Sequence, residues 1–279
     1  MFLSLRKAYF AFVMNEVRAK KHLGQHFLAD KNIASKISLS LGKKDCSNVL
    51  EIGPGKGILT SFLIGRRFKN FKAVEIDHEA AAYLEREFTG LDLIKADFLA
   101  LDLDRYFEGD VAIIGNFPYN ISSQIFFRVL KYRSKVCELT AMLQKEVAER
   151  LVSGPGSKVY GILSVLLQAY YDVELLFTVP PGVFVPPPKV KSAVIRLVRK
   201  EVEPVIDDED LFFRVVKITF NQRRKTIKNS LKPLVDASGI DNDLLRKRPE
   251  QLGVDEFIEL SELVNALLIK NTKSHAKDN

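Results

Sequence analysis

The sequence predicts an α/β protein in which a mostly parallel sheet is followed by a small helical domain. Apolar, strand-like runs alternate with helical patterns through the first two thirds of the chain, which is typical of strand–helix–strand units. Beyond residue 211 only helical patterns remain, and a stretch at 200–210 with a proline and an acidic run separates the two regions. We predict an N-terminal extension at 1–19, domains at 20–203 and 204–270, and a tail at 271–279.

Short apolar runs predict the first strands of the sheet. Residues 49–52, 71–76 and 91–94 are each apolar enough for a buried strand. Glycines after the first run lead into a helix starting at 58, and the alanines and leucine of 78–88 share one helical face.

The second half of the sheet is predicted in the same way. Strands are expected at 111–115 and 137–143, and helices at 122–132 (capped by Ser122 or Ser123), 145–151 and 161–171. Residues 173–179 and 191–198 are strand-like and are joined by a proline-rich segment, so we expect a hairpin-like final pair with one antiparallel strand. The C-terminal helices are expected at 211–220, 226–235, 244–247 and 254–269.

Composition limits the classes of function. The chain has 279 residues, 47% hydrophobic and 28% charged, which supports a folded core. A net charge of +7 favours a polyanionic partner. Cys46, Cys137 and four scattered histidines lack metal-ligand spacing, so we expect no metal site, a reducing cytoplasmic setting, and cysteines that are buried small residues. No apolar run is long enough to span a membrane.

The segment Asn116-Phe117-Pro118-Tyr119 is the most informative motif. It follows the strand at 111–115, and open α/β sheets bind ligands at the carboxyl ends of their strands. The Asn116 amide oxygen and the Pro118 carbonyl can accept the two hydrogens of an exocyclic amine on a nucleobase. Tyr119 offers a face on which the base can stack. The alternative interpretation is an ordinary turn, because Asn and Pro are common turn residues.

Glycines and two carboxylates predict a cofactor pocket. Gly53, Gly55 and Gly57 lie between a strand and a helix, where glycine allows a ligand to approach the backbone. Glu75 ends the next strand and can bind both ribose hydroxyls. The G-x-G-x-G spacing differs from that of dinucleotide sites, and Asp97 can bind an adenine amino group. These details favour S-adenosylmethionine, although Asp97 is also a good helix N-cap.

Together these motifs resemble one family, the small-subunit ribosomal RNA adenine dimethyltransferases of the kasugamycin-sensitivity type. The resemblance covers roughly residues 20–268. Its marks are Gly24-Gln25-His26-Phe27-Leu28, Glu51-Ile52-Gly53-Pro54-Gly55, Glu75-Ile76-Asp77, Asp97, Asn116-Phe117-Pro118-Tyr119-Asn120-Ile121-Ser122, Val185-Pro186-Pro187-Pro188-Lys189-Val190 and Phe220-Asn221-Gln222-Arg223-Arg224-Lys225.

The resemblance implies a Rossmann-like class I methyltransferase sheet and S-adenosylmethionine as methyl donor. It implies dimethylation of two adjacent adenosines near the 3′ end of 16S rRNA, a role in small-subunit biogenesis, and a monomer acting on the 30S subunit or a pre-30S particle. His26 and Leu28 would close over the donor, Gly53 would face its methionine part, and Asn116 would lie between donor and acceptor. His26 stands where Asn is common in the family, and Phe117 where Leu is common.

The residues around the motif suggest how RNA is held. The target base must leave its stack to enter the pocket, and Phe184 is a candidate for its second stacking face, with a core position as the alternative. Basic clusters predict phosphate contacts, with solvated surfaces as the alternative. The residues expected to contact RNA are Lys189, Lys191, Arg223, Arg224 and Lys225.

Three other functions are compatible with parts of the sequence. A nicotinamide-dependent dehydrogenase would explain the glycines but neither the 116–119 motif nor the basic helical domain. A 23S rRNA adenine methyltransferase of the macrolide-resistance type would share the chemistry, although the 220–225 motif favours the small-subunit family. A non-catalytic assembly factor, or a mitochondrial transcription-factor relative, would share the fold.

Overall fold

The computed structural model describes residues 17–42, 46–66 and 68–275, and these form two compact units. The first unit holds the described residues up to Ala148 together with Val173–Arg199, and the second holds Glu149–Asp172 and the chain from Lys200 onward. Residues 149–172 thus group with the C-terminal helices, whereas the predicted first domain runs continuously to 203. The first sixteen residues of the predicted extension and the end of the predicted tail lie outside the described residues.

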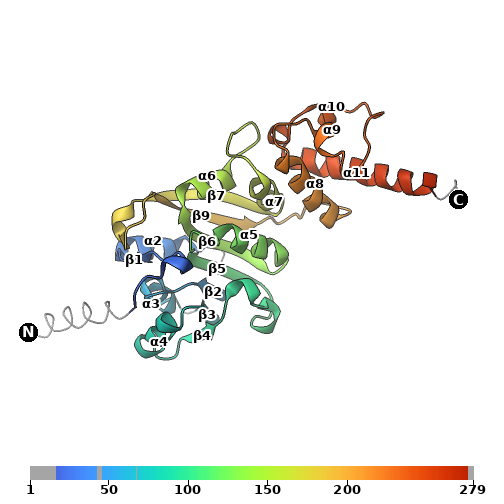
Figure 1. Cartoon of the computed structure of the whole chain (residues 1–279). Helices are drawn as coiled ribbons and strands as arrows, with labels where there is room; N and C mark the ends of the chain where they lie inside the picture. Colours follow the sequence, from blue (N-terminus) through green and yellow to red (C-terminus); the bar gives the residue numbers. More distant parts are fainter. Residues whose placement is uncertain (1–16, 43–45, 67, 276–279) are drawn as a thin grey trace, which may run out of the picture. The chain divides into compact units, whose positions relative to one another are not determined.

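A mostly parallel sheet organises the first unit (Figure 1). Strands β2 to β6 pair in parallel, and β9 runs antiparallel to β6. This confirms the predicted fold class with its antiparallel strand. The strands of this sheet, in spatial order, are β4 (Asp92–Lys95), β3 (Asn70–Glu75), β2 (Asn48–Ile52), β5 (Val111–Asn116), β6 (Val136–Gln144), β9 (Ser192–Arg199) and β7 (Tyr171–Val179).

Helices cover the sheet and present apolar residues to it. Helix α2 (Lys31–Ser40) packs against α3 (Ile58–Ile64), and both share a buried cluster with alternate residues of the central strands. Successive side chains of a strand point to opposite faces of the sheet, so alternate residues face the layer formed by these helices. The other helices that begin in this unit are α4 (His78–Glu87), α5 (Ser122–Lys131) and α6 (Lys145–Val152), and the short 3-10 turns are η1 (Lys21–Leu23), η2 (Phe98–Ala100), η3 (Leu103–Arg105) and η4 (Pro181–Val183).

Two predicted helix boundaries differ from the structure. Helix α5 begins at Ser122, so neither Ser122 nor Ser123 is its N-cap; the cap position is Ile121, without a side-chain hydrogen bond. The helix expected at 226–235 is reduced to α9 (Ile227–Ser230), which ends shortly before Pro233. Proline restricts the residue before it and cannot donate to a helix interior, which explains the early end.

The second unit is helical and has its own aromatic core. It contains α7 (Ile162–Tyr170), α8 (Glu209–Asn221), α9, α10 (Asp243–Arg246), η5 (Pro249–Gln251) and α11 (Val254–His275). The Phe220 ring stacks on Phe257 with centroids 5.7 Å apart and meets Tyr160 edge-on at 5.9 Å. Such aromatic contacts add to the energy of burial. Within the described part of the chain, no helix has both the length and the apolar character needed to cross a membrane.

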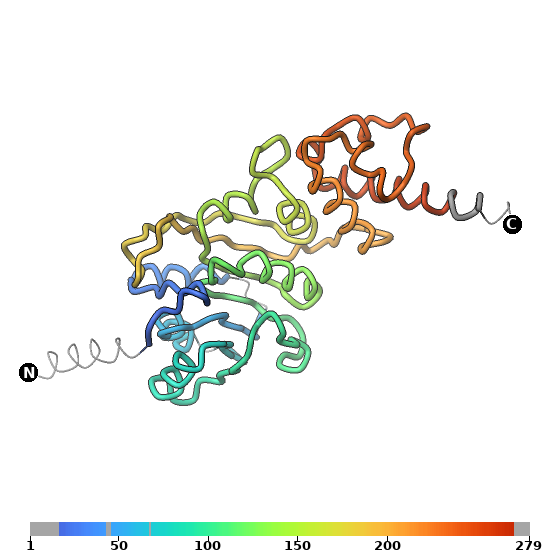
Figure 2. Tube along the Cα trace, in the orientation of Figure 1, coloured from blue at the N-terminus to red at the C-terminus, as the bar shows by residue number. Residues whose placement is uncertain are grey.

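A two-stranded pairing outside the main sheet brings distant segments together. Strand β1 (Phe27–Leu28) pairs antiparallel with β8 (Phe184–Val185), and Figure 2 shows the blue N-terminal trace beside the yellow segment that holds β8. Two residues carry no periodicity that would identify a strand. This pairing was therefore absent from the sequence prediction.

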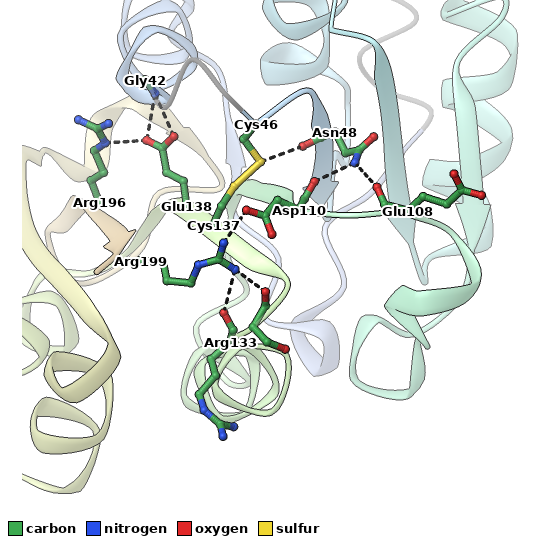
Figure 3. The surroundings of a disulfide bond; sticks show 11 residues. Gly42, Cys46, Asn48, Glu108, Asp110, Arg133, Cys137, Glu138, Arg196 and Arg199 are labelled. Carbon is green, nitrogen blue, oxygen red and sulfur yellow. Dashed lines mark hydrogen bonds and ion pairs between the residues drawn. A yellow bond between two sulfur atoms is a disulfide. The ribbon is translucent and has the colours of Figure 1, made fainter. Parts of the chain in front are cut away.

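The two cysteines differ from the prediction. Cys46, just before β2, and Cys137, in β6, are both buried and form a disulfide (Figure 3). They are separated by 91 residues in sequence and become neighbours because β5 alone lies between β2 and β6. The argument for a reducing compartment from unpaired cysteines is therefore wrong.

Candidate functional site

A cavity of about 210 Å³ opens at the carboxyl ends of four parallel strands. Its wall includes Ile52, Glu75 and Asn116, which end β2, β3 and β5, and Ala96 and Asp97, which follow β4. This edge of the sheet is the expected position for a ligand in an open α/β sheet. The residues that line this cavity include His26, Phe27, Gly53, Gly55, Glu75, Ile76, Asp97, Asn116, Pro118 and Tyr119. The structure thus brings together most of the site residues predicted from sequence.

The glycine turn between β2 and α3 forms the floor of the cavity. Gly53 and Gly55 have φ values of 64° and 55°, in the left-handed region that favours glycine. A Cβ at Gly53 would meet no atom within 4 Å, so its backbone faces open space. A Cβ at Gly55 would lie 2.8 Å from the Phe27 ring. Phe27 therefore lies directly over the turn, a contact that the sequence analysis missed.

Glu75 places a buried carboxylate at the end of β3. Its two oxygens accept hydrogen bonds from the backbone N–H groups of Gly55 at 3.0 Å and Asp77 at 2.9 Å. Burial raises the pKa of Glu75, and these backbone hydrogen bonds oppose the rise. The carboxylate is thus held by the glycine turn on one side and by the start of α4 on the other. Its remaining lone pairs can accept hydrogen bonds from hydroxyl groups.

Asp97 caps a short helix, as one of its two interpretations predicts, and it also lines the cavity. One carboxylate oxygen accepts from the Leu99 N–H at 2.8 Å and caps η2, while the residue also lines the cavity. A carboxylate can accept several hydrogen bonds at once. Capping therefore orients Asp97 and leaves its other oxygen available for an amino group.

Asn116 is oriented by a hydrogen bond from its amide nitrogen. The Nδ2 group donates to the His26 carbonyl at 2.8 Å, which assigns the amide so that Oδ1 is the acceptor left for another partner. Phe117 is buried against Phe126 and anchors the turn. The Pro118 carbonyl accepts from the Ile121 N–H at 3.3 Å, so one acceptor lone pair remains.

Tyr119 forms one wall of the cavity and is fixed at both ends. Its hydroxyl lies 2.5 Å from Ser192 Oγ, and its ring lies 5.3 Å from the His26 ring. Burial raises the pKa of the Tyr119 hydroxyl above its usual value. His26 Nδ1 in turn donates to the Pro186 carbonyl at 2.9 Å. The His26 ring is thus held by the proline-rich segment, and the Tyr119 ring by Ser192 at the start of β9.

Residues 20–28, here called the N-terminal strap, form another wall of the cavity. The strap supplies lining residues from His22 to Phe27. Leu28 is buried and lies beside a smaller cavity of about 30 Å³ that it shares with Glu51, Gly53 and Asn116. His26 and Leu28, predicted to close over a donor, therefore border two adjoining spaces.

Phe184 lies in the core, which is the alternative to its predicted stacking role. It is 2% exposed, pairs with Leu28 in the β1–β8 ladder, and packs in the cluster between α2, α3 and the sheet. This packing favours the core interpretation over a stacking role. The sequence could not separate the two, because both positions suit an aromatic side chain.

Several basic residues near the predicted RNA contacts, and Arg223 among those contacts, are engaged in structural contacts. Arg196 pairs with buried Glu138 at 2.6 Å, and Arg199 pairs with Asp110 at 2.5 Å (Figure 3). Arg223 donates to the Ser157 carbonyl at 3.0 Å and lies 3.5 Å from Glu250. The exposed members of the predicted clusters include Lys189, Lys191, Arg224 and Lys225.

Comparison with known proteins identifies the family. A profile of the ribosomal RNA adenine dimethylase family matches residues 16–253. Similar proteins named ribosomal RNA small subunit methyltransferase A occur in Parabacteroides distasonis, with 53% identity over 89% of this chain and 94% of the relative, and in Flavobacterium johnsoniae, with 51% identity over 91% and 98%.

Solved structures agree with the fold. A dimethyladenosine transferase from Plasmodium falciparum matches with a TM-score of 0.71 and 24% identity, covering 89% of this chain and 98% of that one. The 23S rRNA methyltransferase ErmE matches with a TM-score of 0.64 and 26% identity, covering 85% and 99%. The family profile and the relatives confirm the resemblance inferred from the motifs, and the chain belongs to the ribosomal RNA adenine dimethylase family.

Proposed function

We propose that this protein is a 16S rRNA (adenine-N6,N6)-dimethyltransferase that modifies two adjacent adenosines near the 3′ end of the small-subunit RNA with S-adenosylmethionine. The observation that carries this proposal is the oriented Asn116 side chain, which keeps Oδ1 as an acceptor and lines the cavity together with Pro118 and Tyr119. The names of the relatives support the choice of the small subunit.

The cavity suits an adenosine-containing donor. The open face of Gly53 admits a ligand next to the backbone, Glu75 offers a carboxylate for ribose hydroxyls, and Asp97 offers one for the adenine amino group. S-adenosylmethionine, when bound, supplies a methyl group on a positively charged sulfonium. The Gly53 end of the cavity would hold its methionine part.

The residues of the 116–119 motif would make the target amine nucleophilic. An exocyclic amine is a poor nucleophile because its lone pair is delocalised into the ring. The Asn116 Oδ1 and Pro118 carbonyl would accept its two hydrogens and favour a tetrahedral nitrogen whose lone pair faces the donor. These hydrogen bonds strengthen as positive charge develops on the nitrogen, so they stabilise the transition state more than the ground state.

The base would enter the cavity beside Tyr119. The bond from the Tyr119 hydroxyl to Ser192 fixes the ring that would stack on an unstacked adenine. Because the transfer is direct, no covalent enzyme intermediate is required. A second round requires that the cavity accept the monomethylated amine, whose one remaining hydrogen would bind one of the two acceptors.

Exposed basic residues would hold the RNA backbone. Lys189 and Lys191 in the first unit and Arg224 and Lys225 in the second are exposed and can contact phosphates. We propose a cytoplasmic monomer that acts on the 30S subunit or a pre-30S particle and takes part in small-subunit biogenesis. The location follows from this substrate.

The decisive experiment uses labelled S-adenosylmethionine and unmethylated 30S subunits, with mass spectrometry of the 3′ rRNA fragment. Wild-type protein should form dimethyladenosine at two adjacent positions. Asn116→Ala should lose roughly 100-fold or more in rate, because an amine-oriented acceptor is removed. Asn32→Ala, the same substitution at an exposed position in α2, should retain wild-type activity.

Three results would contradict parts of the proposal. Methylation of 23S rRNA instead would keep the chemistry and overturn the substrate. Donor binding without transfer to rRNA would favour a non-catalytic assembly role. Failure of wild-type protein to bind the donor would overturn the methyltransferase assignment itself.

A further inference from the structure

The strap that walls the donor cavity is fastened at its base to one buried carboxylate. Asp77 lies just after β3, and its side chain is 0% exposed. Lys20 Nζ lies 2.6 Å from Asp77 Oδ1, and Gln25 Nε2 donates to Asp77 Oδ2 at 3.0 Å. The backbone N–H of Lys20 also donates to Gln25 Oε1 at 2.9 Å. These three contacts close a ring around the strap residues 21–24, which lie between Lys20 and Gln25.

We propose that Asp77 is a positioning residue that holds the N-terminal strap closed over the donor through Lys20 and Gln25. The inference deepens the proposed function and rests on it for the identity of the donor. Asp77 itself does not line the cavity, whereas strap residues from His22 to Phe27 do. Its effect on donor binding would therefore be exerted through the strap.

Asp77 also connects the strap to the donor-binding carboxylate. Its Oδ1 accepts from the Glu79 N–H at 3.0 Å and caps α4, while its own backbone N–H donates to Glu75 at 2.9 Å. Although burial alone would raise the pKa of Asp77, the hydrogen bonds from Lys20 and Gln25 outweigh it and lower the pKa. Asp77 thus holds the strap and the start of α4 through its charged carboxylate, and Glu75 through its backbone N–H.

Further contacts set the strap against the acceptor side of the cavity. Gly24 has φ 63°, and a Cβ there would lie 2.4 Å from Asn120 Oδ1, so the strap backbone lies directly on the loop after the 116–119 motif. Asn120 Nδ2 donates to the His22 carbonyl at 3.2 Å. Because its base is held at Asp77, the strap keeps the His26 and His22 carbonyls in place as acceptors for Asn116 and Asn120. Loss of the contact at Asp77 should weaken both hydrogen bonds.

The test compares Asp77→Asn with a matched variant, Asp208→Asn. Asn is a good N-cap, so the first substitution keeps the cap of α4 while removing the buried charge that Lys20 contacts. The second acidic contact of Lys20, exposed Glu79 at 3.2 Å, remains. Asp208 caps α8 in the second unit by accepting from the Leu211 N–H at 2.8 Å. The second variant therefore repeats the same chemistry at a helix start that does not hold the strap.

Two measurements report on the strap. The first is the rate of limited tryptic cleavage after Lys21 without donor, and the second is the dissociation constant for S-adenosylmethionine by calorimetry. We expect Asp77→Asn to be cleaved about fivefold faster and to bind the donor about tenfold more weakly, because binding must then also order the loosened strap.

A second variant avoids the α4 cap altogether. Lys20→Met removes one ring contact and leaves Asp77 in place, and Lys20→Arg should restore slow cleavage and tight binding, which a general loss of stability would not allow. Cleavage and donor affinity within twofold of wild type in both Asp77→Asn and Lys20→Met would overturn the proposal. If wild-type protein bound no S-adenosylmethionine, the proposed function would fail, while cleavage without donor would still decide whether Asp77 holds the strap.

Discussion

Glu51 is an acid that the fold encloses between the sheet and the glycine turn. It is 1% exposed, and one of its carboxylate oxygens is buried without a hydrogen-bond partner among the described residues. Burial raises the pKa of Glu51 from 4.5 to about 8, and nearby Glu75 contributes to the rise. The folded protein therefore keeps a proton between about pH 4.5 and 8 that the unfolded chain releases. This contribution to stability is complete below the unfolded pKa and is lost as the pH rises toward 8.

Glu51→Gln should remove this dependence. Over that range the free energy of unfolding of the wild type should fall, relative to the variant, by about 1.4 kcal/mol per pH unit. Urea unfolding at several pH values would measure the difference between the two proteins. Glu174→Gln, on an exposed residue of β7, is the control and should change the profile little. Parallel profiles for wild type and Glu51→Gln would show that Glu51 is ionised in the folded state.

Among the secondary-structure elements, the antiparallel pair of β6 and β9 contains an ion pair with a buried carboxylate. Glu138 in β6 has a side chain that is 0% exposed, and it accepts from Arg196 Nε in β9 and from the Gly42 N–H. Arg196→Met would leave the buried carboxylate without this cation. Loss of one partner of a buried pair typically costs about 3 kcal/mol or more, so thermal or urea unfolding should show a large loss of stability.

Arg246→Met is the control for this prediction. Arg246 pairs with Asp241 in the loop before α10 and with Asp243 in α10. The side chains of these two partners are 85% and 89% exposed. Pairs of this kind contribute less than about 1 kcal/mol. Equal losses of stability in both variants would refute the distinction between a buried and an exposed pair. RNA affinity should also be unaffected by Arg196→Met under conditions where the protein is folded, because this arginine serves the sheet.

At the scale of the whole molecule, RNA affinity should depend on exposed cations in both units. Arg224→Ala/Lys225→Ala and Lys189→Ala/Lys191→Ala should each lower the slope of log affinity against log salt concentration by about 1 to 2, because each phosphate contact releases about one counterion. Binding to a 16S rRNA fragment at several salt concentrations would measure the slopes. Lys69→Ala/Lys131→Ala, which removes two exposed charges outside these clusters, should leave the slope unchanged. Equal slopes in all four proteins would place the RNA elsewhere.

The chain's local patterns were sufficient to predict most elements of the sheet. Strands such as Val111–Asn116 and helices such as His78–Glu87 agree with the predicted ranges within one or two residues. Apolar runs and the helical spacing of apolar residues can be recognised from neighbouring residues alone. The glycine turn, Glu75, Asp97 and Asn116 could be placed at one edge because the ends of parallel strands meet there.

Other features depend on residues that are distant in sequence. The Phe27 contact with Gly55 and the anchoring of Lys20 on Asp77 join segments that no local pattern relates. The same holds for the cysteines, which are brought together by strand order. Arg223 is a predicted RNA contact, and only the folded chain shows that it lies beside Glu250.

Local periodicity and motifs of a few adjacent residues were enough to establish the fold class and the family, and they predicted the chemistry of the cavity. Only the tertiary structure decided which charges are structural, how Asn116 is oriented, and which carboxylate holds the strap. Each of these depends on long-range pairing, in which a side chain's role is set by the partner that folding brings to it.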